Sequence, residues 1–89
     1  MPQSLAKIYI HAVFSTKARQ PLLADPWREE LFQVLGGIAN NLGCQSVIVG
    51  GMSDHVHMLF ALGRTLSLAD AMRSIKANAS AWIDESRRI

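Results

Sequence analysis

Residues 44–62 read CQSVIVGGMSDHVHMLFAL. This segment holds two apolar runs rich in β-branched residues, 44–49 and 54–62, on either side of the short stretch Gly-Gly-Met-Ser at 50–53. Runs of this kind joined by a Gly-containing turn are typical of an antiparallel β-hairpin. We therefore expect two neighbouring strands here, and the flanking segments must complete the sheet that they begin.

The second run of the hairpin alternates between two kinds of side chain. Successive side chains of a strand point to opposite faces of a sheet. One face of this strand should therefore pack in a core, while the other carries two histidines. The core set is Val56, Met58 and Phe60, and the opposite set is His55, His57 and Leu59.

Three further elements flank the hairpin. Residues 6–16 (AKIYIHAVFST) alternate with a period of two, which predicts a strand. Apolar residues at three- and four-residue spacing predict two helices. The first begins at Asp25-Pro26 and ends at Gly43, and the second runs from Ser67 to about Arg87.

The element order is then β-α-β-β-α, which indicates an α+β fold with an antiparallel sheet and both helices on one face. It matches a ferredoxin-like β-α-β-β-α-β domain that lacks its last strand. The opposite face of the sheet is expected to have no cover. The expected core residues of the strands are Ile8, Ile10, Phe14, Ile48, Val56, Met58 and Phe60, and the opposite face is expected to carry Tyr9, His11, Val13, Val47, Val49, His55, His57 and Leu59.

Length and composition limit the class of protein. The chain has 89 residues, 49% of them hydrophobic and 18% charged, which fits one globular domain over 1–89. The net charge of +2 permits a nucleic-acid partner without demanding one. No apolar run is long enough to span a membrane, and the N-terminus lacks a secretory pattern. With Cys44 as its single cysteine, the chain is expected in the cytoplasm.

His55 and His57 form the pair with the clearest chemical meaning. Two residues apart on a strand, their Cβ atoms lie roughly 6–7 Å apart on one face. Imidazoles at that spacing can converge on one divalent cation, which can act as a Lewis acid on a phosphate oxygen. A pair of half-exposed strand histidines without a ligand is the other interpretation.

Three segments resemble a known family in the family's own order. They are Gly50–Phe60 (GGMSDHVHMLF), Tyr9–Lys17 (YIHAVFSTK) and Ser74–Ile83 (SIKANASAWI). Together they resemble the transposases of the smallest bacterial insertion sequences and their domesticated relatives associated with repetitive extragenic palindromes. These are tyrosine transposases of the His-hydrophobic-His (HUH) endonuclease class. The resemblance covers nearly the whole chain.

The resemblance implies a function. In this family a tyrosine attacks single-stranded DNA and forms a 5′-phosphotyrosine, and a histidine pair holds Mg or Mn. By position, His55 and His57 match the metal ligands. The tyrosine helix and last strand of the family follow the point where these 89 residues end, so a truncated, catalytically inactive transposase domain is expected. The resemblance also implies single-stranded or hairpin DNA as partner, and a homodimer.

Three further residues could join the histidine pair. Tyr9, the one tyrosine of the chain, could replace the missing nucleophile, but an aromatic that fills the sheet face is the simpler interpretation. His11 could be a third metal ligand or an unliganded sheet histidine. Asp54 is expected to be a turn residue, since strand alternation aims it away from the histidines.

Four basic residues are candidates for contacts with DNA phosphates. Lys17 and Arg19 follow the first strand, and Arg73 and Lys76 share one side of the second helix with Ser80. Each pair could equally be a set of solvated charges.

Three functions remain open from the sequence. The first is a truncated or degenerate transposase, and the second is a non-catalytic module that binds single-stranded or hairpin DNA. The third, a metal-binding or structural domain unrelated to DNA, leaves the resemblance along the whole chain unexplained.

Overall fold

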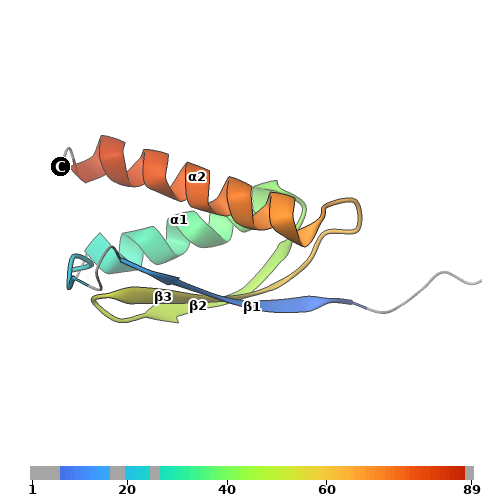
Figure 1. Cartoon of the computed structure of the whole chain (residues 1–89), viewed down its shortest axis with the longest axis horizontal. Coiled ribbons are helices and arrows are strands. Elements are labelled where there is room, and N and C mark those ends of the chain that lie inside the picture. The colour runs from blue at the N-terminus through green and yellow to red at the C-terminus, as the bar shows by residue number, and fades with distance from the viewer. Residues whose placement is uncertain (1–6, 17–19, 25–26, 88–89) are drawn as a thin grey trace, which may run out of the picture.

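The computed structural model describes residues 7–16, 20–24 and 27–87 of the chain. Its elements confirm the predicted β-α-β-β-α order (Figure 1). Gly50 and Gly51 belong to the second strand, where the sequence predicted a turn. The predicted helix start at Asp25-Pro26 lies outside the described residues. The bounds are β1 Tyr9–Ser15, α1 Trp27–Asn41, β2 Gln45–Gly51, β3 His55–Ala61 and α2 Leu68–Arg87.

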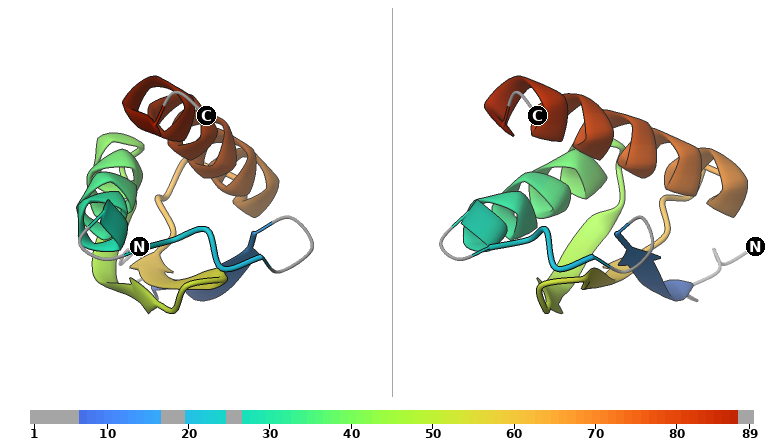
Figure 2. Two further views of the ribbon diagram at one scale, coloured as in Figure 1. Left: turned by 90° about the vertical axis from the view of Figure 1, so that its left-hand side faces the viewer. Right: turned by 60° about the vertical axis from the view of Figure 1, so that its left-hand side comes forward.

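The three strands form one antiparallel sheet in the order β1-β3-β2. The central strand β3 places His57 opposite Val13 of β1 and Gly50 of β2. Both helices lie on one side of this sheet, as predicted (Figures 1 and 2). Among the described residues no element covers the other side, which we call the open face. It consists of Tyr9, His11, Val13, Ser15, Ile48, Gly50, His55, His57 and Leu59.

The core lies between the sheet and the two helices. Met58, Phe60 and Ile75 are fully buried, and the apolar stripe of α1 packs against them. The indole rings of Trp27 and Trp82 stack at 5.9 Å and join the two helices. Neither helix, within the part of the chain that the structure describes, is long and apolar enough to cross a membrane.

Local signals at the helix ends work as the sequence predicted. The backbone N–H of Asp70 donates to the Ser67 hydroxyl at 3.1 Å, which caps the N-terminus of α2. Gly43 follows α1 with a φ of +85°, a conformation that glycine adopts without steric cost.

A β-bulge in β2 makes two of the predicted face assignments wrong. The register shifts between Ser46 and Ile48, so that Ile48 lies opposite Leu59 on the open face and is 61% exposed. Val49 lies opposite Met58 and packs against the core. The sequence analysis assigned Ile48 to the core and Val49 to the other face. A bulge adds one residue to a strand, so every residue after it points to the opposite face from the one that simple alternation predicts.

Strand β1 pairs with β3 on one side, and no described strand pairs with its other side. The N–H of Leu62 donates to the Ile8 carbonyl at 2.7 Å, and the N–H of Thr16 donates to the Asp54 carbonyl at 2.9 Å. In an antiparallel ladder every second residue makes such bonds. The even-numbered residues of β1 therefore bond to β3, and the backbone groups of Tyr9, His11, Val13 and Ser15 point outward.

The sequence predicted Ile8 as a core residue, and that prediction is wrong. Ile8 immediately precedes β1 and its side chain is 60% exposed. An edge strand has neighbours on one side only, so a side chain at its end receives less cover than one on the central strand.

Candidate functional site

The two histidines of β3 converge on the open face. His55 Nε2 lies 3.1 Å from His57 Nε2, and the rings are nearly perpendicular, with centroids 4.7 Å apart. Both side chains are partly buried. The strand therefore brings the two Nε2 atoms together on one face of the sheet.

Asp54 orients the first of these rings. Its Oδ1 atom lies 2.7 Å from His55 Nδ1, and the two side chains are 28% and 20% exposed. A carboxylate in this position accepts a hydrogen bond from Nδ1–H. The imidazole then carries its proton on Nδ1, and Nε2 is free to bind a metal ion. The sequence predicted Asp54 as a turn residue, and it lies in the turn before β3. The prediction that its side chain points away from the histidines was wrong. Asp54 precedes β3, so the strand alternation that it was judged by does not apply to it.

The backbone before β3 is held by neighbouring residues. The Asp54 carbonyl accepts hydrogen bonds from the Thr16 N–H at 2.9 Å and the Thr16 hydroxyl at 3.2 Å. The N–H of Met52 donates to the His55 carbonyl at 2.9 Å. Gly51 has a φ of +154°, and a Cβ there would collide with the His55 carbonyl oxygen. This turn therefore needs glycine at position 51 to bring Asp54 and His55 into place.

His11 lies next to the pair without completing a three-residue site. Its ring stacks on that of His57, with centroids 5.7 Å apart and an angle of 29°. Among the described residues, no group of three or more His, Cys, Asp or Glu side chains could hold a metal ion. The candidate ligands that the structure brings together here are therefore His55 and His57.

Tyr9 shares the open face but stands far from the histidine pair. It lies opposite Ala61, whereas Val13 lies opposite His57. Four residue steps separate these levels, which is about 14 Å of strand. The tyrosine hydroxyl therefore does not reach a phosphate held at the histidines, and Tyr9 is misplaced as a substitute nucleophile.

The donor set fits a divalent metal ion. With a metal–nitrogen bond of about 2.1 Å, ligands at right angles lie about 3.0 Å apart and ligands at the tetrahedral angle about 3.4 Å. The observed distance of 3.1 Å between the Nε2 atoms is close to the first value. It is equally an N–H···N hydrogen bond when one ring carries a proton on Nε2. The distance between the two Nε2 atoms is therefore compatible with a six-coordinate ion.

The basic candidates do not gather around this pair. Lys17 and Arg19 lie outside the described residues. Arg73 on α2 forms an ion pair with Asp70 at 2.6 Å, and both side chains are largely exposed. Lys76 also lies on α2, on the helix side of the sheet. Neither Arg73 nor Lys76 therefore shares a surface with His55 and His57.

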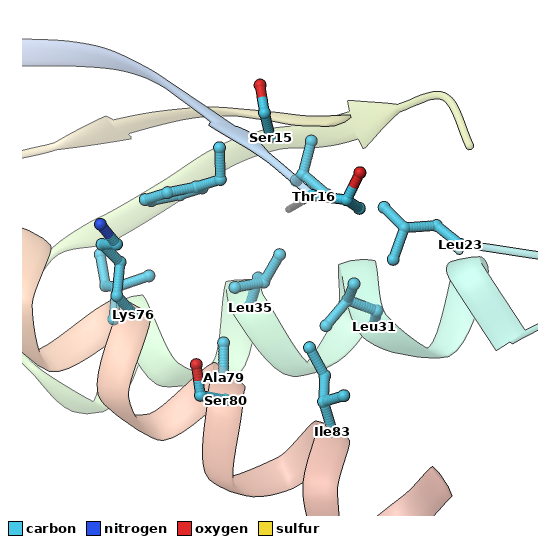
Figure 3. A pocket seen from close by; sticks show the side chains of 12 residues that line it. Ser15, Thr16, Leu23, Leu31, Leu35, Lys76, Ala79, Ser80 and Ile83 are labelled. Carbon is cyan, nitrogen blue, oxygen red and sulfur yellow. The ribbon is translucent and has the colours of Figure 1, made fainter. Parts of the chain in front are cut away.

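A cavity of about 200 Å³ lies on the helix side of the sheet (Figure 3). Its walls are mostly apolar side chains from both helices and the core face of the sheet, with Lys76 and Ser80 of α2 among the lining residues. Ser15 points away from it, toward the open face. The sheet separates this cavity from the histidine pair, so the two do not form one site.

The fold and the site define a class: an α+β domain with an open antiparallel sheet that carries a histidine pair suited to a divalent ion. A family model described as Transposase IS200 like matches residues 4–88. The match spans nearly the whole chain, so this protein belongs to the IS200-like transposase family.

A solved structure supports the fold. The chain is similar to a protein of Deinococcus radiodurans described as a transposase, with 23% sequence identity and a TM-score of 0.88. The match covers 97% of this chain and 66% of the other, so the chain spans slightly less than two thirds of that protein. No curated protein matches the sequence.

Proposed function

We propose that the chain forms the metal- and DNA-binding part of a single-strand DNA transposase and does not cleave DNA by itself. The family reaction would be strand cleavage and rejoining through a 5′-phosphotyrosine. The observation that carries the proposal is the 3.1 Å approach of His55 Nε2 to His57 Nε2, with Asp54 bound to the far nitrogen of His55.

His55 and His57 would hold Mg or Mn, with water and a DNA phosphate oxygen in the other coordination positions. A divalent ion bound there would supply Lewis-acid polarisation of the scissile phosphate. Asp54 would fix the tautomer of His55 and keep its Nε2 directed at the ion. Lys17 and Arg19, in the segment after β1, and Arg73 and Lys76 on α2 are proposed to contact DNA phosphates outside the histidine pair.

The nucleophile would come from a tyrosine outside these 89 residues. Tyr9 stands about 14 Å along the strand from the level of His57, and a strand residue has a fixed position. The same observation favours a second candidate function, a module that binds single-stranded or hairpin DNA without chemistry.

Anisotropy of a labelled single-stranded DNA hairpin tests the shared part of both functions. Mn should strengthen binding by the wild-type chain, and the His55→Ala/His57→Ala variant should lose that increment. Binding that ignores Mn in the wild type would contradict the metal site, and absence of any binding would contradict both functions. A covalent protein–DNA adduct that Tyr9→Phe abolishes would show that the chain is catalytic.

We also propose that the chain forms a homodimer through β1. The outward backbone groups of Tyr9, His11 and Val13 face no partner strand among the described residues, and the strand carries no proline. Such an edge is a template for pairing with a second strand. Antiparallel pairing of two β1 strands about a twofold axis would join two sheets into one.

A further inference from the structure

Three side chains on the open face form a line along β1. Lys7 lies just before the strand, and its Nζ atom is 3.4 Å from Gln45 Oε1 of β2, at the end of the sheet beyond Tyr9. The tyrosine follows and is 55% exposed. His11 is next, exposed and stacked on His57. The Lys7 ammonium, the Tyr9 ring and the His11 ring thus lie in this order along the strand, and His11 is nearest to the histidine pair.

The residue opposite Tyr9 on the neighbouring strand is small. It is Ala61, whose side chain is a single methyl group. Tyrosine usually buries most of its ring against neighbours when it has a purely structural role. An exposed ring beside a small residue on a sheet is instead suited to stacking on a flat ligand.

The described carboxylates lie mostly on the helix side of the sheet. Among the described residues, five of the six carboxylates lie on the helices, at Glu29, Glu30, Asp70, Asp84 and Glu85. The sixth is Asp54, which is bound to His55. In the described part of the chain, the open face therefore offers a cation and rings, and its one carboxylate is bound to His55. This complements a polyanion whose bases are unpaired.

We propose that Tyr9 stacks on a nucleobase of the single-stranded DNA whose phosphate is held at His55 and His57, and that Lys7 contacts a backbone phosphate beyond that base. The inference rests on the proposed function and adds the path of the strand, which runs along β1. Tyr9 is thereby a positioning residue that sets which nucleotide reaches the metal site.

The spacing agrees with this path. About 14 Å separates the level of Tyr9 from the level of His57, and bases stacked in a duplex rise about 3.4 Å each. A stacked strand would therefore place about four nucleotide steps between the base on Tyr9 and the nucleotide at the metal, and a more extended strand would place fewer. Exposed aromatic rings on open sheets stack on the bases of single strands in this way. Pairing of β1 with a second copy would use its outward backbone groups, so it leaves the rings of the open face accessible.

The test compares two labelled 12-nucleotide probes, oligothymidine and an abasic deoxyribose-phosphate oligomer, by anisotropy in EDTA and again with Mn. Tyr9→Ala should weaken oligothymidine binding about fivefold or more and leave the abasic oligomer unaffected. Tyr9→Phe should retain oligothymidine binding. Lys7→Ala should weaken binding of both probes, because it removes a phosphate contact. Ile8→Ala is the matched control, since Ile8 is 60% exposed beside Tyr9 and points away from the open face.

The outcomes separate this inference from the function that it rests on. If the wild type binds oligothymidine and Tyr9→Ala binds equally well, the stacking role is wrong and the proposed function stands. If Tyr9→Ala changes the oligomeric state and not DNA binding, the ring belongs to a contact between copies and the inference is wrong. A wild type that binds neither probe, with or without Mn, overturns both.

Discussion

The Nδ1 atom of His55 lies 2.7 Å from the Oδ1 atom of Asp54, the residue immediately before it. This contact fixes the ring so that its Nε2 meets Nε2 of His57 at 3.1 Å. A carboxylate behind a histidine is a common support for a metal site, because it sets the tautomer and raises the basicity of the ligating nitrogen. The turn before β3 therefore sets the orientation of the His55 ring on the open face, because it holds Asp54.

Replacement of Asp54 by Ala should weaken Mn binding about 10- to 100-fold, the usual cost of losing such a support. Calorimetric titration with Mn measures the change. Asp84→Ala is the matched control, because it removes an equal charge from an exposed position on α2. Unchanged Mn affinity in Asp54→Ala would mean that the contact has no role in metal binding.

Replacement of Gly51 by Ala should destabilise the fold by about 1–3 kcal/mol or more, because the added Cβ meets the His55 carbonyl oxygen at a positive φ. Gly37→Ala is the matched control. It lies inside α1 with no atom near the added Cβ, so the change should stabilise the helix by up to about 1 kcal/mol. Urea unfolding followed by circular dichroism compares them, and equal stability of the two variants would refute the account of this turn.

Replacement of Val13 by Pro tests the proposed dimer. The N–H of Val13 points away from β3, so proline there removes an outward donor and spares the β1–β3 ladder. Sedimentation equilibrium at tens of micromolar should show a dimer for the wild type and for Val13→Thr, and a monomer for Val13→Pro. A monomeric wild type would contradict the dimer, whereas a dimer that survives Val13→Pro would move the contact to another surface.

The sequence was sufficient for the fold because its strongest patterns are local. The alternation of Val56, Met58 and Phe60, the cap at Ser67 and the glycine at 43 each have one clear physical reading, and the structure agrees with all three. The bulge near Ile48 escaped prediction because inserting one residue leaves the apolar composition of a strand unchanged.

The candidate site was predictable in part. The placement of His55 and His57 on one face follows from strand geometry alone. The resemblance to transposases implied that the pair binds a metal ion. The position of the Asp54 carboxylate depends on a turn that ends before the strand begins, so no periodic pattern reports it. The placement of Arg73 and Lys76 away from the histidines follows from how α2 packs, which is a property of the tertiary structure.

Calorimetric titration with Mn of the wild type and three single histidine variants tests the central claim most directly. The account predicts one modest-affinity site per chain, because water fills most coordination positions, and predicts that His55→Ala and His57→Ala each abolish it. His11→Ala should retain the site, since no three-residue metal group includes His11 in the described part of the chain. Mn binding that persists unchanged in both His55→Ala and His57→Ala would contradict the account.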